Sequence, residues 1–120
     1  KKLNYNLIIV DRELKWKDPN ILFFNKHTIR EVFALTSISN LIITQDSGLL
    51  HIGAAFDKRI ISIFGPTDAS IRCAYNNAVG IHSYFQCYPC WYNRCKELHC
   101  LKSIKPHIVE NKVLEILENG

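Results

Sequence analysis

The 120-residue sequence contains no methionine, no internal repeat and no long run of apolar residues. The apolar stretch nearest its start is Leu7–Val10, whereas a helix that crosses a bilayer needs ~18–20 such residues. We therefore expect neither a membrane span nor a signal peptide. A content of 48% apolar and 22% charged residues excludes a disordered chain. The length suits a single domain over residues 1–120, and the missing methionine leads us to expect a piece of a longer protein.

The charge of the sequence is mildly positive. The net charge is +4 and the isoelectric point is about 8.8. Because the lysines and arginines are spread along the chain and form no cluster, we expect no nucleic-acid partner. A positive balance of this size would suit a small molecule that carries phosphate, or an anionic membrane surface. The charge alone does not decide between these two.

The five cysteines are unevenly distributed. Cys73 stands alone and is expected to pack, because no activating base is evident beside it. An odd total without a secretory signal favours a reducing compartment. Cys87 and Cys90 have the Cys-x2-Cys spacing of half a zinc site, but Cys95 and Cys100 are spaced more widely than the usual second half. A structural zinc ion, local disulfides and free thiols all remain open, whereas a catalytic metal is not expected.

Short apolar runs alternate with amphipathic segments along the chain. Within the runs, apolar residues do not alternate with polar ones, which is typical of parallel strands buried on both faces. Thr28 followed by Glu31 has the spacing of a capping box at the start of a helix. This order of elements predicts an α/β fold with a parallel sheet and helices on both faces. We expect strands at Asn6–Val10, Ile21–Phe24, Leu41–Thr44, Arg59–Phe64 and Ala78–His82, and helices at Thr28–Ser37, Gly48–Phe56 and 106–119.

The turn Asp46-Ser47-Gly48-Leu49-Leu50-His51 joins the third expected strand to the helix that follows it. In parallel sheets, ligands bind beyond the carboxyl ends of the strands. Ser47 can cap the helix, Gly48 lets a ligand approach the backbone, and the free amides of the first helical turn favour a phosphate. Asp46 would repel a phosphate, so we expect it either to bind hydroxyl groups, such as those of a sugar, or to hold a loop amide. His51 lies one turn further on, where its imidazole can donate to a phosphate oxygen.

A plainer interpretation makes Asp46 and Ser47 simple helix caps and His51 a partly buried core residue. A second polar turn bears on this choice, because Gly65-Pro66-Thr67-Asp68 directly follows the next expected strand. Two polar turns at the carboxyl ends of neighbouring parallel strands would face one crevice. We therefore favour a ligand site over simple capping.

The two turns, in this order and at this spacing, resemble the C-terminal half of glycosyltransferase family 9, the ADP-heptose:lipopolysaccharide heptosyltransferases. The resemblance runs from Asn40–Thr44 through Ala54-Ala55 to Ile63–Asp68 and extends more loosely over almost the whole chain, including the cysteine-rich segment 87–100. It implies a Rossmann-like domain that binds a nucleotide sugar, within a two-domain GT-B enzyme. The first strand of that domain is expected to be missing.

The resemblance also implies roles for individual residues. The family's Asp-x-Gly-x-x-His turn contacts the donor sugar and the diphosphate, and the Gly-Pro-Thr-Asp turn lies close to it. Glu13 and His27 resemble, less closely, the rim that holds the nucleoside. The implied donor-binding residues are Asp46, Ser47, Gly48, His51, Thr67 and Asp68.

The implied reaction is an inverting transfer of heptose from ADP-heptose to the lipopolysaccharide inner core, without a metal or other cofactor. The family's catalytic base is an Asp of an N-terminal domain, so the 120 residues alone are expected to be inactive. The enzyme would be cytoplasmic, or peripheral at the inner face of the inner membrane. Without the first strand, the sheet would have open edges, which predicts a strand-mediated homodimer.

An alternative from a different class is a non-enzymatic, zinc-ribbon-like module that binds nucleic acid or protein. It would use the four clustered cysteines as zinc ligands and the neighbouring aromatic and basic residues as its binding surface. Titration with ADP separates the two hypotheses, because only the donor-binding interpretation places a nucleotide at Asp46–His51 and Gly65–Asp68.

Overall fold

The structure is a computed structural model of the chain, and it describes residues 5–11, 13, 15, 17–91 and 95–119. By its internal contacts the chain divides into two compact units, Lys1–Ala34 and Leu35–Gly120. In chain order the elements are β1 (Ile8–Val10), β2 (Leu22–Phe24), α1 (Ile29–Ile38), β3 (Leu41–Gln45), α2 (Gly48–Ala55), β4 (Arg59–Ile63), α3 (Ala69–Arg72), β5 (Ala78–Ile81), α4 (His99–Lys102) and α5 (Pro106–Asn119).

The N-terminal unit contains a two-stranded parallel sheet, in which β1 pairs with β2. The chain turns between these strands at Asp18, whose carbonyl accepts a hydrogen bond from Ile21 N at 3.1 Å. Helix α1 begins after Thr28, whose Oγ1 accepts from Glu31 N at 3.2 Å, as in the predicted capping box. The Glu31 carboxylate accepts from the Thr28 hydroxyl instead of from the backbone amide that the standard motif uses.

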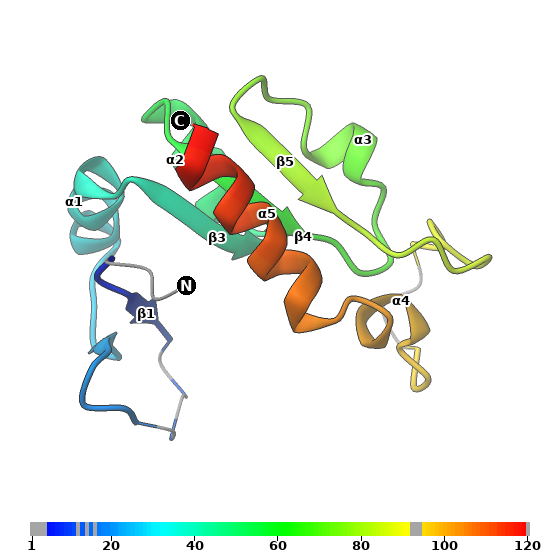
Figure 1. The fold of residues 1–120 in the computed structure, drawn as a ribbon, viewed down its shortest axis with the longest axis horizontal. Coiled ribbons are helices and arrows are strands. Elements are labelled where there is room, and N and C mark those ends of the chain that lie inside the picture. The colour runs from blue at the N-terminus through cyan, green and yellow to red at the C-terminus, as the bar shows by residue number, and fades with distance from the viewer. Residues whose placement is uncertain (1–4, 12, 14, 16, 92–94, 120) are drawn as a thin grey trace. The chain divides into compact units, whose positions relative to one another are not determined.

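The second unit contains a three-stranded parallel sheet in the order β3-β4-β5 (Figure 1). Ile42 lies opposite Ile60, and Ile61 lies opposite Val79. The carboxyl ends of all three strands therefore lie at the same end of the sheet, where the chain leaves β3 for α2 and β4 for α3.

Among the described residues β3 pairs with β4 alone, so the other side of β3 has no hydrogen-bonded strand there. The strand-mediated dimer stays a prediction.

Helices α2 and α5 cover opposite faces of this sheet, as Figure 1 shows. Successive residues of a strand point to opposite faces, and two neighbours in β4 mark the two sides. Arg59 donates through Nη1 to the carbonyl of Ile116 in α5 at 3.0 Å. A Cβ atom added to Gly53 of α2 would lie 3.0 Å from Ile60 Cδ1, so the glycine lets α2 lie close against β4.

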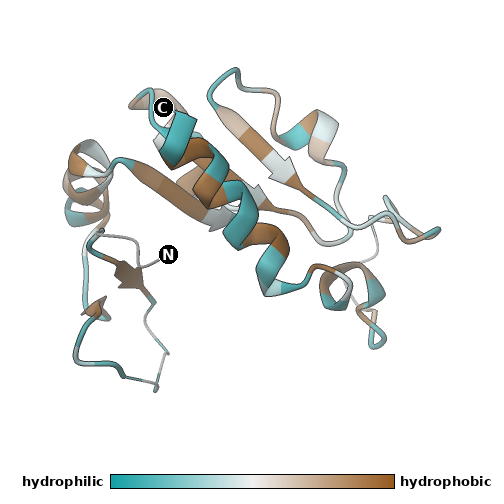
Figure 2. Ribbon diagram, in the orientation of Figure 1, coloured by the Kyte–Doolittle hydropathy of each residue, from teal (hydrophilic) through white to brown (hydrophobic). Residues whose placement is uncertain are grey.

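The core of this unit lies between the sheet and α2. Leu50, Ile60 and Phe64 are fully buried, and Ile42 and Ala69 are nearly so. Burial of a large apolar side chain stabilises the fold by ~1.5–3 kcal/mol. Figure 2 shows the matching pattern, with hydrophobic strands and an α5 that alternates hydrophobic and hydrophilic residues. This packing holds the N-terminus of α2 at the carboxyl end of β3.

The predicted α/β class, with parallel strands and flanking helices, is confirmed. The strands of the described residues are distributed over two sheets. Helices α3 and α4 were not predicted, because four residues are too few to show an apolar periodicity. The prediction of one domain over the whole chain stays a prediction. No helix within the described ranges is long and apolar enough to cross a membrane.

Candidate functional site

The two polar turns that follow β3 and β4 are joined directly. Thr67 Oγ1 donates a hydrogen bond of 2.7 Å to Asp46 Oδ2. Both side chains are half-buried, and the residues are 21 positions apart in the sequence. The structure therefore brings together the two segments that the sequence predicts to face one crevice. The second carboxylate oxygen of Asp46 remains available to accept from another hydroxyl group.

The N-terminus of α2 lies beside this carboxylate. Ser47 occupies the N-cap position with extended backbone angles, but its side chain makes no cap hydrogen bond. Its hydroxyl lies instead 3.1 Å from Thr44 Oγ1. Ser47 therefore occupies the N-cap position, but its side chain does not accept a hydrogen bond from the first amides of α2. These amides can donate to another acceptor.

Gly48, the first residue of α2, faces open space. A Cβ atom added there would meet no atom within 4 Å, and no glycine of the described chain has a positive φ. Neither packing nor backbone conformation therefore requires a glycine at this position. The predicted role of Gly48, to let a ligand approach the backbone, stays a prediction.

His51 lies three residues after Gly48, on the same side of α2. Its Nδ1 lies 2.6 Å from the hydroxyl oxygen of Tyr75, and the two rings meet edge-on, with centroids 5.7 Å apart. Both residues are exposed, so His51 is not the core residue of the plainer interpretation. The sequence gives no sign of this pairing, because Tyr75 follows α3, 24 residues away.

Asp68 acts as the N-cap of α3. Its Oδ1 accepts from Ser70 N at 2.9 Å and from Ser70 Oγ at 2.7 Å. One carboxylate oxygen is thus occupied within the turn. A contact between Asp68 and a donor stays a prediction.

The segment around Cys90 supports the Gly65–Asp68 turn, and sequence reasoning missed it. The carbonyl of Pro66 accepts from the amides of Cys90 at 3.1 Å and Trp91 at 3.0 Å. The Tyr88 hydroxyl accepts from the buried amide of Ala69 at 2.8 Å. These partners lie about 20 residues from the turn, so no local pattern in the sequence announces them.

Tyr88→Phe is expected to destabilise this unit. The change removes only the hydroxyl and leaves the Ala69 amide buried without an acceptor, which costs ~1–3 kcal/mol in the free energy of unfolding. Denaturant unfolding measures the loss. Tyr84→Phe is the matched control, because Tyr84 is 93% exposed and should change the stability by less than about 0.5 kcal/mol. Equal stabilities of the two variants would contradict the proposed support.

The described cysteines are all free thiols. Cys87 and Cys90 are exposed, whereas Cys100 is buried. Among the residues that the structure describes, no three side chains of His, Cys, Asp or Glu are grouped as metal ligands would be. A structural zinc ion or disulfides at Cys87, Cys90, Cys95 and Cys100 stay a prediction.

Cys73 packs against the core of the second unit. Burial, and then the charge of Asp46, raise the pKa of its thiol. A raised pKa lowers the fraction of thiolate near neutral pH, and the thiolate is the reactive form. Cys73 therefore packs against the core, as the sequence predicts.

Glu13 and His27 belong to the N-terminal unit. Glu13 is exposed, and its amide donates to Asp11 Oδ1 at 2.8 Å. His27 is half-buried. Their predicted role at the rim of a nucleoside site stays a prediction.

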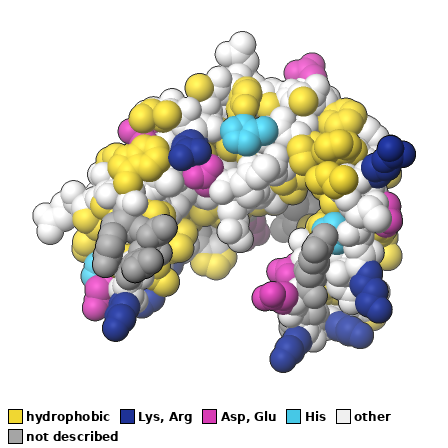
Figure 3. Space-filling view, turned by 180° about the vertical axis from the view of Figure 1, so that it is seen from behind, with side chains coloured by type: hydrophobic (Ala, Val, Ile, Leu, Met, Phe, Trp, Pro, Cys, Tyr) yellow, Lys and Arg dark blue, Asp and Glu magenta, His cyan; other side chains and the backbone are white. Residues whose placement is uncertain are grey.

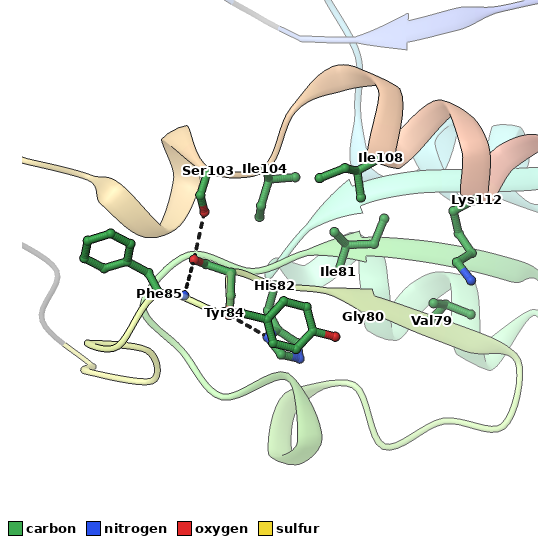
Figure 4. Close-up of a pocket in the computed structure, with 11 residues that line it drawn as sticks. Val79, Gly80, Ile81, His82, Tyr84, Phe85, Ser103, Ile104, Ile108 and Lys112 are labelled. Atoms are coloured by element: carbon green, nitrogen blue, oxygen red, sulfur yellow. Dashed lines mark hydrogen bonds between the residues drawn. The ribbon is translucent and has the colours of Figure 1, made fainter.

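A pocket of about 580 Å³ lies elsewhere, between β5 and the start of α5 (Figure 4). Its walls are mainly apolar, and the Ser83 hydroxyl closes one end by accepting from Ser103 Oγ and Phe85 N, each at 2.8 Å. Its one lysine, Lys112, is paired with Glu115 at 2.9 Å. None of the predicted donor-binding residues lines this pocket, so its size alone does not make it the donor site.

Figure 3 views the molecule from the side that α2 covers. Hydrophobic side chains lie there beside histidine and both kinds of charged side chain. The guanidinium carbon of Arg72 lies 5.5 Å from the centre of the Trp91 ring. This face is therefore mixed in character.

Both turns lie within the part of the chain that matches a known protein family. The sequence model of glycosyltransferase family 9 (heptosyltransferase) matches residues 10–101. That range contains β3, α2, β4 and the whole cysteine-rich segment 87–100. No solved structure matches the chain.

Two relatives are heptosyltransferases of one species. Lipooligosaccharide heptosyltransferase 2 of Campylobacter jejuni serotype O:2 is 32% identical over 100 residues, which are 80% of this chain and 31% of the relative. Its counterpart in serotype O:6 is 31% identical over 77% of this chain and 30% of its own length. Lipopolysaccharide heptosyltransferase 1 of Pseudomonas aeruginosa is 41% identical over 51 residues, 42% of this chain and 14% of its own. The chain thus spans less than a third of these relatives, and nothing in the comparisons supports the zinc-ribbon alternative.

Proposed function

The chain belongs to glycosyltransferase family 9, and from that membership we propose that it is the donor-binding portion of a heptosyltransferase. The observation that carries the proposal is the hydrogen bond from Thr67 to Asp46. It joins the turns at the carboxyl ends of two neighbouring parallel strands, which is where ligands of such sheets bind. The open space at Gly48 lies at the same edge.

The donor would use each part of the site for a different group. Its diphosphate would accept hydrogen bonds from the first amides of α2, because a helix N-terminus favours anions. Asp46 would accept from hydroxyl groups of the sugar through the oxygen that Thr67 leaves available. His51, on the same side of α2 as Gly48, would donate to a phosphate oxygen.

We propose ADP-heptose as the donor and the lipopolysaccharide inner core as the acceptor. An acceptor hydroxyl, deprotonated by a base on another domain, would attack the anomeric carbon and invert it while ADP leaves. The amides of α2 and the His51 side chain would stabilise the charge that grows on the leaving diphosphate, without a metal ion. Transfer would take place in the cytoplasm, either in solution or at the inner face of the inner membrane. With the base on another domain, as in the family, the 120 residues would bind the donor and would not transfer the sugar.

Calorimetric titration of the 120-residue chain with ADP-heptose tests this function. We expect saturable binding that a metal chelator does not weaken, because backbone amides and the His51 side chain would hold the diphosphate. A titration with zinc serves as the control for the alternative. Absence of nucleotide binding, together with stoichiometric zinc, would overturn the proposal.

A further inference from the structure

We infer that Tyr75 is a positioning residue for His51, and that it fixes which ring nitrogen of His51 carries the proton. The inference deepens the proposed function and rests on it for the identity of the ligand. Its starting point is the distance of 2.6 Å between His51 Nδ1 and the Tyr75 hydroxyl oxygen. This is a short hydrogen bond between two exposed side chains from different parts of the chain.

The backbone of Tyr75 is held in place independently of His51. Its carbonyl accepts from Ala78 N at 3.2 Å, at the first residue of β5. Nearby, Asn77 Nδ2 donates to Asp57 Oδ1 at 3.4 Å, which ties the same loop to the end of α2. The hydroxyl of Tyr75 is therefore delivered to His51 from a loop that the sheet and α2 both anchor.

The direction of the hydrogen bond follows from the chemistry of its partners. A neutral imidazole has one nitrogen that donates and one that accepts, and the partner of one nitrogen sets the role of the other. A phenol hydroxyl donates well to an imidazole nitrogen, so the short contact assigns O–H to Tyr75 and the lone pair to Nδ1. The edge-on rings, inclined by 72°, agree with a hydroxyl directed at a ring nitrogen. His51 then carries its proton on Nε2.

This tautomer suits the role that the site requires. Nε2–H is a donor, and because the bond directions of the two ring nitrogens diverge on either side of Cε1, it points away from Tyr75. With His51 on the same side of α2 as Gly48, that donor can add to the amides at the helix N-terminus. The other tautomer would turn a lone pair toward the phosphate oxygen and repel it. Tyr75 thus sets the polarity of His51 without touching the ligand.

The test compares Tyr75→Phe with the wild-type chain in two measurements. Long-range proton–nitrogen spectra of isotope-labelled histidine, recorded at alkaline pH where imidazole is neutral, report the tautomer of each ring. The signals of His51 are assigned with His51→Gln. Titration with ADP reports the affinity. Tyr84→Phe is the matched control, because it removes a hydroxyl from a residue that is 93% exposed and belongs to neither turn in the sequence.

We expect the wild-type His51 to be an Nε2–H tautomer and the Tyr75→Phe variant to become a mixture. Affinity for ADP should fall about three- to tenfold in that variant and stay unchanged in Tyr84→Phe. An Nδ1–H tautomer in the wild type, or an unchanged spectrum in Tyr75→Phe, would overturn the inference while ADP binding could still support the proposed function. If Tyr75 controls the tautomer but the wild type binds no ADP, the proposed function fails and the role at a phosphate fails with it.

Discussion

Replacing Asp46 by alanine is expected to weaken binding of ADP-heptose about 100-fold while leaving the affinity for ADP unchanged or slightly higher. The carboxylate would accept from sugar hydroxyls, and two charge-assisted hydrogen bonds at ~1.5 kcal/mol each amount to roughly that factor. ADP carries no heptose, so it has no sugar contact that the variant could remove. Loss of the Asp46 charge also reduces the repulsion between this side chain and the diphosphate. Calorimetric titration of the Asp46→Ala variant with both ligands measures the difference.

A control variant and a second measurement accompany Asp46→Ala. The control, Thr67→Val, removes the hydroxyl that holds Asp46 but keeps the carboxylate, so the loss of affinity for ADP-heptose should be smaller, about three- to tenfold. In Asp46→Ala the pKa of Cys73 should fall, because the charge of Asp46 is one of the two causes that raise it, and alkylation of this thiol should become faster. Equal losses for ADP and ADP-heptose would contradict the assignment of Asp46 to the sugar.

Gly48→Ala is expected to weaken binding of ADP at least about tenfold and at the same time to stabilise the fold. The added methyl group enters open space, so no packing is disturbed. Alanine also restricts the unfolded chain, and at a compatible helical position this adds ~0.4–1 kcal/mol to the free energy of unfolding. The same methyl group occupies the space through which a phosphate would reach the amides of α2. Denaturant unfolding and titration with ADP measure the two effects.

Gly53→Ala offers the matched comparison within the same helix. There a Cβ atom would lie 2.9 Å from Ile42 Cδ1 and 3.0 Å from Ile60 Cδ1, so the core must shift and the stability should fall by ~1 kcal/mol or more. The folded Gly53→Ala variant should still bind ADP. If Gly48→Ala bound ADP as tightly as the wild type, the open space at Gly48 would not be the place of the diphosphate.

The elements that carry the site could be predicted from the sequence within one residue at each end. Strands β3 and β4 are short, mainly apolar segments that end at polar turns, and the turn residues limit where each segment can begin and end. The capping pair of Thr28 and Glu31 is likewise a local pattern. The parallel arrangement of the strands by itself predicts that the two turns lie close together.

The contacts that refine the site could not be predicted in this way. The partner of His51 is 24 residues distant, and the amides that hold Pro66 come from Cys90 and Trp91, beyond β5. Such contacts depend on how loops pack against each other, and the periodicity of apolar residues in the sequence carries no information about this packing. Ser47 shows how a local sequence pattern can mislead. Its position predicts a side-chain N-cap, but its hydroxyl lies 3.1 Å from Thr44 Oγ1 and makes no cap hydrogen bond. Because the Ser47 hydroxyl does not cap α2, the first amides of the helix remain available to a ligand.

The central claim is that the turns after β3 and β4 form one nucleotide-sugar site, and amide chemical shifts during titration of the chain with ADP-heptose test it most directly. We predict that the largest shifts fall together on Asp46–His51 and Gly65–Asp68, with one saturation curve for both segments. Shifts confined to the pocket between β5 and α5, or the absence of shifts at either turn, would contradict it.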